Sequence, residues 1–242
     1  MVPPSVDTPR TPRAQARIEL TRQIKQVARA QLEAEGAANV SLRAVTRELG
    51  MVSSSIYRYF ASRDELLTAL IIDAYVALGE VAAGELDRAI EDGASHGERW
   101  RRVCRAVRAW AHEHPQGWAL VYGSPVVGYE APTDTIEPAG RTAAVLGRIA
   151  HDAAHDGVLA ATTTLAAPQA EPDVVALVGG DATLADRALT SWITLIGTIN
   201  FELFGHLNNV VRDHDGYFDE AMAIAAESWG LHVELDDTTA PS

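Results

Sequence analysis

The side chains best suited to molecular recognition lie together in residues 50–60, which read GMVSSSIYRYF. Three consecutive serines, and two tyrosines on either side of Arg58, place hydrogen-bonding groups between the apolar residues Ile56 and Phe60. Serine hydroxyls can donate to and accept from base edges, and their small size lets a backbone sit close in a groove of DNA. Tyrosine hydroxyls suit phosphate oxygens. The composition of this stretch therefore indicates contact with a nucleic acid.

Two other patterns could support catalysis. The run GASHG matches the Gly-x-Ser-x-Gly motif around Ser95, but that motif needs a strand before the serine, and the preceding LDRAIED reads as the end of a helix. His151 and His155 are four residues apart on a predicted helix and could share a metal ion, although no third ligand is identifiable. His112 and His114 are two apart, share no helical face and are expected at the surface. An all-α metalloenzyme or hydrolase that uses these residues is the alternative function.

The charge of the chain is unevenly distributed. Its 242 residues carry a formal net charge of −13, which by itself argues against a nucleic-acid partner. Residues 1–67, however, contain ten Lys/Arg and seven Asp/Glu, a net charge of +3, whereas the remainder contains 10 basic and 26 acidic residues. A basic segment on an acidic body can bind phosphates with one end and repel them with the other. The acidic composition therefore does not exclude DNA.

The remaining bulk properties predict a cytoplasmic globular protein. A hydrophobic content of 47% and a charged content of 22% are ordinary for this class. No apolar run approaches the roughly 18–20 residues that cross a bilayer, so no membrane contact is expected. The N-terminal MVPPSVDTPRTPR lacks the apolar core of a secretory signal. Cys104 is the only cysteine, which excludes an internal disulfide, and we expect it to be a small buried side chain.

The elements that position these residues are predicted to be helices. Nearly all of the chain between residues 13 and 230 has helical apolar spacing and no segment has strand alternation, so the predicted fold class is all-α. Gly36 is placed to end a first helix, and Ser41 to cap a short second one. Residues 53–60 are predicted as a third short helix, and the capping-box sequence SRDE starts a longer one. Later helices are predicted around the Trp100–Ala111 stripe and over residues 139–156, about 183–207 and about 215–230.

Two short helices joined by a tight turn and braced by a longer one describe a helix-turn-helix. On a helical wheel, Ser54 and Arg58 point away from the side that carries Ile56 and Phe60, with Ser55 and Tyr57 beside them. This arrangement predicts a DNA-binding domain over residues 13–61, after a disordered arm over residues 1–12 that could reach the minor groove. A helical domain for effector binding and dimerisation follows over residues 62–232, and a disordered tail over residues 233–242.

Residues 41–70, SLRAVTRELGMVSSSIYRYFASRDELLTAL, resemble the tetracycline-repressor (TetR) family of bacterial transcriptional regulators. The family pattern is Gly-Val-Ser-x-x-x-Leu-Tyr-x-Tyr-Phe followed by a Ser-Lys-x-x-Leu start. It is matched by Gly50, Ile56, Tyr57, Tyr59, Phe60, Ser62, Arg63 and Leu66. Val52 departs from it where the family usually has serine, and Ser53 is expected to take over that cap. By position, the resemblance implies DNA contacts from Arg43, Ser53, Ser54, Ser55 and Tyr57, with Arg63 and Tyr59 near the DNA backbone.

The resemblance reaches more weakly into the C-terminal two-thirds. Residues 109–141 look like an actinobacterial subgroup whose penultimate helix carries a Trp-His-Gly signature; here Trp192 and Gly197 are kept and Ile196 replaces the histidine, whose role is not transferred. In the family this domain binds an effector and pairs with a second copy through its last two helices. Aromatic walls with one amide make the candidate ligand pocket Trp110, Trp118, Tyr122, Trp192 and Asn200. The candidate dimer residues are Phe204, Leu207, Met222 and Ala225.

These observations predict a homodimeric, ligand-responsive repressor that binds a palindromic double-stranded DNA operator. It needs no cofactor and has no enzymatic activity. It is expected in the cytoplasm, associated with the nucleoid. A small hydrophobic or amphipathic effector would release it by shifting the spacing of the two recognition helices, which must fall near one DNA turn, about 34–36 Å.

Overall fold

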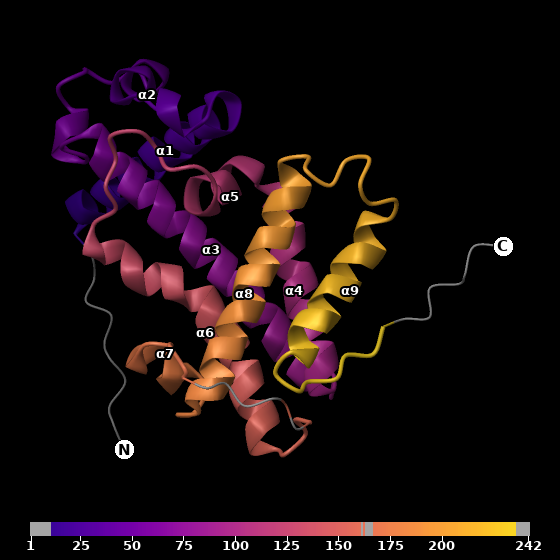
Figure 1. Ribbon diagram of the computed structural model, residues 1–242. Helices are drawn as coiled ribbons and strands as arrows, with labels where there is room; N and C mark the ends of the chain where they lie inside the picture. Colours follow the sequence, from indigo (N-terminus) through magenta and orange to yellow (C-terminus); the bar gives the residue numbers. More distant parts are fainter. Residues whose placement is uncertain (1–10, 161, 163–166, 236–242) are drawn as a thin grey trace, which may run out of the picture. The chain divides into compact units, whose positions relative to one another are not determined.

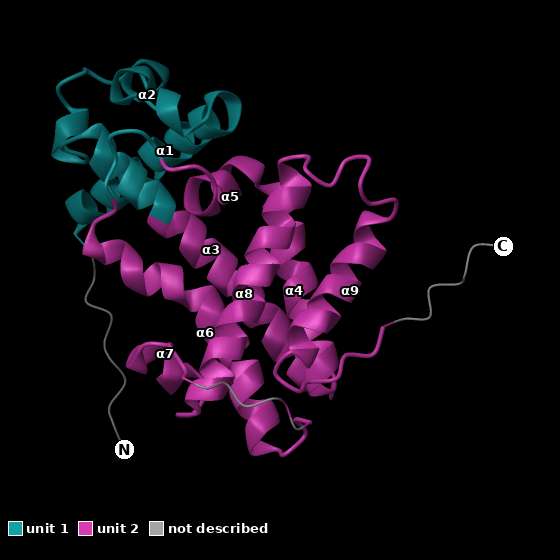
Figure 2. Ribbon diagram, viewed as in Figure 1, with its two compact units in different colours: residues 1–71, 126–130 teal, residues 72–125, 131–242 magenta. Residues whose placement is uncertain are grey.

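The computed structural model describes residues 11–160, 162 and 167–235, and within these ranges the chain forms helices and no strands (Figure 1). The predicted all-α class is confirmed. The chain divides into two compact units (Figure 2). The first contains the described residues up to Ile71 together with Val126–Glu130, and the second contains Ile72–Pro125 and the described residues from Ala131 onward. The predicted terminal arm and tail lie mostly outside the described residues.

Helix α1, Pro12–Glu35, begins and ends at residues whose chemistry favours a helix terminus. The Thr11 hydroxyl accepts a hydrogen bond from the Ala14 N–H at 3.2 Å. Pro12 occupies the first turn, where a missing N–H removes no intrahelical bond. Gly36 follows with a φ of 77°, in the left-handed region that favours glycine. The predicted helix end at Gly36 is therefore confirmed.

Helix α2, Leu42–Glu48, follows a 3-10 turn, η1, at Ala37–Asn39. Ser41 occupies the N-cap position, but its hydroxyl makes no capping hydrogen bond, so the predicted side-chain cap is absent. The buried apolar residues of α1, α2, the next turn and the start of α3, Arg63–Glu91, form the core of the first unit. They include Ile24, Ala28, Leu32, Val45, Ile56, Phe60, Leu66 and Leu67.

Residues 53–60 do not form the third helix that the sequence predicts. Only Ile56–Arg58 close a 3-10 turn, η2, and the three serines before it lie in turns. The Ser55 hydroxyl donates to the Val52 carbonyl at 2.6 Å, and the Ser55 N–H donates to the same oxygen at 2.8 Å. Serine side chains that bond to nearby backbone groups compete with α-helical hydrogen bonds. The segment is therefore a tight turn, which still buries Ile56 and Phe60.

Helix α3 contributes residues to both units, and its start confirms the predicted capping box. The Ser62 hydroxyl accepts from the Glu65 N–H at 3.1 Å, and the Glu65 carboxylate accepts from the Ala61 N–H at 2.5 Å. Contrary to the sequence prediction, α3 is long and apolar enough to cross a membrane, with a mean hydropathy of 1.8 over 18 residues. Asp73 and Glu80 interrupt the apolar run and hid it. One such helix is weak evidence for a membrane span, because core helices of soluble proteins pass the same test.

The second unit consists of the rest of α3 and a set of helices packed around α4. These are α4 (His96–Glu113), α5 (Pro115–Tyr122), the 3-10 turn η3 (Thr133–Thr135), α6 (Ile136–His155), α7 (Pro172–Leu177), α8 (Ala182–Leu203) and α9 (His214–Glu227). Helix α4 contacts α5, α6, α8 and α9, and α8 contacts α9 (Figure 1). The last helices predicted from the sequence are confirmed as α6, α8 and α9, with ends that differ by at most four residues.

Polar side chains begin the helices of the second unit, and large aromatic residues fill its core. Asp181 caps α8 by accepting from the N–H groups of Thr183 and Leu184 at 2.8 and 3.0 Å. The core includes Trp100, whose Nε1–H donates to the Met222 carbonyl at 2.9 Å and so joins α4 to α9. Because that donor is buried, its pairing avoids the penalty of an unmatched polar group.

Candidate functional site

The polar residues predicted to contact DNA lie on the first unit, and most of them face solvent. The exposed members are Arg43, Ser53, Ser54, Tyr57 and Arg58, and the half-buried ones are Ser55, Tyr59 and Arg63. Ile56 and Phe60 are 1% and 5% exposed, whereas Tyr57 between them is 54% exposed. The apolar anchors therefore hold the turn in the core and leave its hydroxyl and guanidinium groups outside.

Helix α1 braces this turn through Arg17. The Arg17 guanidinium donates to the Arg58 carbonyl at 3.2 Å and lies 5.6 Å from the centre of the Tyr59 ring. A cation over an aromatic face is attracted by the ring quadrupole. The Tyr59 ring is thus used inside the unit, while the Arg58 side chain is exposed. This bracing fixes the backbone beside the exposed serines.

The Arg63 side chain binds the chain's own backbone. Its Nε–H donates to the Val40 carbonyl at 3.0 Å, and one terminal nitrogen donates to the carbonyls of Ala37 and Ala38 at 2.8 and 3.1 Å. The other terminal nitrogen lies 3.7 Å from the Asp64 carboxylate. These bonds tie the first turn of α3 to the connection between α1 and α2. The geometry gives Arg63 a structural task, and its phosphate contact stays a prediction.

Four of the five predicted effector residues form one packed cluster in the second unit. The Trp118 Nε1–H donates to Asn200 Oδ1 at 2.8 Å, and the Asn200 amide donates to the Tyr122 carbonyl at 3.1 Å. The Tyr122 ring lies 4.7 Å from Trp118 and 6.2 Å from Trp192, centre to centre. Burial raises the pKa of the Tyr122 hydroxyl far above its usual value. The fifth residue, Trp110, instead stacks on His114 at 4.9 Å.

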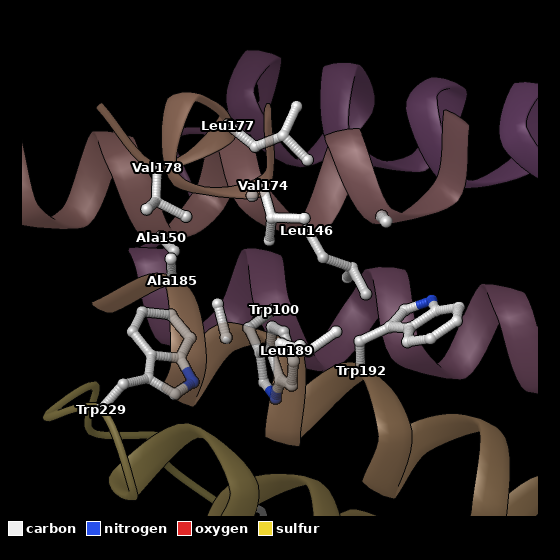
Figure 3. A pocket seen from close by; sticks show the side chains of 13 residues that line it. Trp100, Leu146, Ala150, Val174, Leu177, Val178, Ala185, Leu189, Trp192 and Trp229 are labelled. Atoms are coloured by element: carbon white, nitrogen blue, oxygen red, sulfur yellow. The ribbon is translucent and has the colours of Figure 1, made fainter. Parts of the chain in front are cut away.

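A separate cavity of about 100 Å³ lies among α6, α7, α8 and two further tryptophans (Figure 3). Trp192 is the only one of the five predicted effector residues among those that line it. The sequence reading missed Trp100 and Trp229. One signal was available: Ala143, Gly147 and Ala150 recur at helical spacing on α6, and small residues opposite large rings leave a void. The presence of that void depends on which helix faces α6.

The predicted dimer residues divide between surface and core. Phe204 is 48% exposed, but Met222 and Ala225 are only 1% and 6% exposed, and Leu207 is also buried. Met222 and Ala225 pack within the protomer's own core and offer no surface to a second chain. The exposed apolar residues of α8 and α9 are Leu189, Ile193, Phe201, Tyr217 and Ile224. The Trp229 side chain, placed by the sequence reading in the dimer surface, is buried in the cavity wall.

The candidate catalytic residues have structural surroundings that do not support catalysis. The Ser95 hydroxyl caps α4 by accepting from the Glu98 N–H at 3.2 Å, and α3 rather than a strand precedes it. His151 and His155 are exposed, with ring centres 6.3 Å apart. Among the described residues, no group of three or more His, Cys, Asp or Glu side chains could hold a metal ion. Cys104 is fully buried, as predicted, and burial raises the pKa of its thiol.

Comparison with known proteins gives two family matches. Residues 24–70 match the model for bacterial regulatory proteins of the tetR family, and residues 100–225 match the model for the tetracyclin repressor-like C-terminal domain. The HTH-type transcriptional regulators Mb1846 of Mycobacterium bovis and Rv1816 of Mycobacterium tuberculosis are each 39% identical over 224 residues. The aligned region covers 86% of this chain and 91% of each relative.

Solved structures give the same result. The crystal structure of the protein SCO4313 is 30% identical, with a TM-score of 0.69, and the match covers 90% of this chain and 100% of that one. A regulatory protein in the tetR family from Rhodococcus RHA1 is 14% identical with a TM-score of 0.58, covering 87% and 96% of the two chains. The second likeness concerns the fold alone.

Proposed function

Because the chain belongs to the tetracycline-repressor (TetR) family, it is a ligand-responsive DNA-binding transcriptional regulator, and we propose that it acts as a homodimeric repressor. In this proposal it binds a palindromic operator and is released by a small, mainly apolar effector. It works in the cytoplasm at the nucleoid, needs no cofactor and makes no use of a membrane. It catalyses no reaction.

The observation that carries the DNA-binding role is the exposed turn of residues 53–58 between two buried anchors. Ser53, Ser54 and Tyr57 are held outward by the rigid placement of Ile56 and Phe60. Short hydroxyl side chains on a tight turn can approach base edges closely. Arg43, exposed in the first turn of α2, supplies a cation that can bind phosphate. We assign direct contact to these residues and a supporting role to Tyr59 and Arg63.

A second copy of the chain is the partner that the outer surface of α8 and α9 fits. Leu189, Ile193, Phe201 and Phe204 follow one another on α8 at intervals that place them on one side of the helix, and Ile224 is exposed on α9. Such apolar surface is unfavourable in water and favours association. Pairing through a two-fold axis presents two recognition turns, as the two half-sites of a palindrome require.

The effector response is assigned to the second unit. A ligand shifts a conformational equilibrium only when it binds the two conformations with different affinity. The cavity is lined by α6, α7 and α8, and α8 also carries the proposed dimer surface. Residues 126–130, which directly precede η3 and α6, belong to the first unit. A ligand that moves α6 or α8 therefore acts on elements joined to both the dimer surface and the DNA-binding unit.

Operator binding is tested by a gel-shift assay with DNA from the promoter beside the protein's own gene. Wild type, Tyr57→Ala and Arg43→Ala are compared at low and high salt. We expect each variant to bind about 10-fold to 100-fold more weakly, the range of one good DNA contact. Thr21→Ala, a change on α1 outside the turn, is the matched control. If the wild type and both variants bind equally poorly at low salt, the proposal is wrong.

A further inference from the structure

The cavity in the second unit has an entirely apolar lining. Its thirteen lining residues include no Asp, Glu, Lys, Arg or His and no hydroxyl side chain. Figure 3 shows Val174, Leu177 and Val178 on one side and the rings of Trp100 and Trp229 on the other. Burying an ion in such a lining is strongly unfavourable without a counter-charge. The lining therefore excludes a charged occupant.

Two hydrogen-bond donors in the cavity wall have no acceptor. The Nε1–H groups of Trp192 and Trp229 are buried and have no partner within the part of the chain that the structure describes. Trp100, between them in the same wall, has its donor paired with the Met222 carbonyl. Buried donors in native proteins are nearly always paired, and an exception calls for an explanation. A ligand that supplies an acceptor explains both.

The volume limits the size of that ligand. A cavity of roughly 150 Å³ with an apolar lining accommodates benzene, and the volume here is about 100 Å³. A stable water molecule needs two to four polar partners, and the lining supplies only the two indole donors without an acceptor of its own. A compact organic group with one acceptor suits this site better than water.

We propose that the cavity binds a neutral, compact apolar molecule that carries a carbonyl or ether oxygen and no charge. The oxygen accepts a hydrogen bond from the Nε1–H of Trp192 or Trp229, and the hydrocarbon part contacts Leu146, Val174 and Leu189. Ketones, lactones and esters have this chemistry, whereas carboxylates and amines do not. The inference rests on the proposed effector-responsive function and names the chemical class of its effector.

The test uses the full-length protein without DNA and with nitrogen-15 in its tryptophans. The chain has five tryptophans, so each indole N–H gives its own NMR signal, which single Trp→Phe variants assign. Cyclohexanone is the probe. Methylcyclohexane has a similar shape and no acceptor, and cyclohexanecarboxylate has acceptors and a negative charge. The three compounds separate the contributions of shape, acceptor and charge.

Cyclohexanone is expected to move the Trp192 or Trp229 signal downfield, because hydrogen bonding deshields the indole proton. The Trp118 signal should stay in place, since Asn200 already accepts its hydrogen bond. Methylcyclohexane should bind without the downfield shift, and the carboxylate at least about tenfold more weakly than the ketone. Equal shifts with ketone and hydrocarbon, tighter binding of the carboxylate, or no binding of either neutral probe would each overturn the inference.

Matched variants connect the signals to the cavity. Ala143 lines the cavity and its neighbour Ala144 is exposed, so Ala143→Leu should abolish cyclohexanone binding and Ala144→Leu should leave it unchanged. Trp192→Phe and Trp229→Phe each keep an aromatic ring and remove one donor. At least one should weaken cyclohexanone about tenfold and leave methylcyclohexane unaffected. Wild-type affinity for the ketone in both variants would contradict the proposed hydrogen bond.

The outcome is independent of operator binding. A protein that binds promoter DNA but no neutral probe would refute the effector class and leave the regulator proposal in place. A protein that binds cyclohexanone at the indoles but no promoter DNA would refute the repressor proposal alone. Signals of the tryptophans outside the cavity, Trp110 and Trp118, show in each sample whether a variant is folded.

Discussion

Arg108 and Glu202 form a two-bonded ion pair that joins α4 to the end of α8. The guanidinium donates to the two carboxylate oxygens at 2.8 and 2.6 Å, and the Glu202 side chain is only 6% exposed. His112 and His214 lie 3.3 and 3.7 Å from the same carboxylate. Paired hydrogen bonds between Arg and a carboxylate fix geometry as well as charge. This contact holds the C-terminal end of the helix that carries the proposed dimer surface.

The Glu202→Gln variant should be less stable at neutral pH by about 2–3 kcal/mol, the range for hydrogen bonds to a charged group. Burial opposes ionisation of Glu202, but hydrogen bonds from Arg108 outweigh it and lower the pKa of the carboxyl. The stabilisation is therefore complete above about pH 4.3, the unfolded value, and is lost as the pH falls through the lower folded pKa. Thermal melts should show the two proteins converging in acid. An equal gap at neutral and acid pH would contradict this, and Glu220→Gln on exposed α9 surface is the control.

Arg63→Ala should destabilise the first unit by about 2 kcal/mol, because three carbonyl hydrogen bonds are lost. All five tryptophans lie in the second unit, so tryptophan fluorescence reports that unit, while far-UV circular dichroism reports both. Urea titrations followed by the two signals should place the loss in the first unit.

The salt dependence of DNA binding separates the two roles of Arg63. Loss of a phosphate contact lowers the salt slope by about one charge, as we expect for Arg43→Ala. At temperatures where Arg63→Ala is folded, its slope should equal that of the wild type. A flattened slope with unchanged stability would mean that Arg63 binds phosphate after all.

Thr68 and Tyr129 should show measurable coupling. Their hydroxyls are 2.9 Å apart, and this contact fastens residues 126–130 to α3 within the first unit. A double-mutant cycle with Thr68→Val and Tyr129→Phe should give a coupling free energy of about 1 kcal/mol in urea unfolding. Additive effects of the two changes would show that the hydroxyl pair contributes nothing to stability.

Asn200→Leu should unfold the protein more easily without affecting the cavity. The change removes the acceptor of the Trp118 Nε1–H and the donor to the Tyr122 carbonyl, and both groups are left unpaired. A loss of about 2–4 kcal/mol is expected for two buried unpaired groups. Cyclohexanone should still bind with wild-type affinity wherever the variant is folded. Selective loss of cyclohexanone binding in a stable variant would instead favour the pocket predicted from the sequence.

Ile193→Glu combined with Phe204→Glu should produce a monomer. Both side chains are largely exposed in the single chain, at 57% and 48%, so a charge there is tolerated by the protomer but not within an apolar interface. Sedimentation velocity measures the oligomeric state, and promoter affinity should fall with it. Val158→Glu, at another exposed apolar position, is the control. A double variant that stays dimeric would place the interface elsewhere.

The DNA-contacting surface was predictable because it depends mainly on neighbours in sequence. The apolar anchors Ile56 and Phe60 and the Ser62–Glu65 capping box act within one or two turns of chain, and the structure has them as predicted. The helical form of residues 53–60 was not predictable from periodicity. Hydrogen bonds from Ser55 to Val52 changed the local geometry without changing which side chains are buried.

The sequence alone determined the all-α class, the end of α1 at Gly36, the exposure of Tyr57 and the burial of Cys104. Each follows from local spacing or from the chemistry of a single residue. Only the tertiary structure decided that Arg63 binds backbone carbonyls, that Met222 belongs to the core, and that the cavity lies between Trp192 and Trp229 rather than beside Asn200. Each of these outcomes depends on which distant helix packs against the residue, and helical periodicity carries no information about that partner.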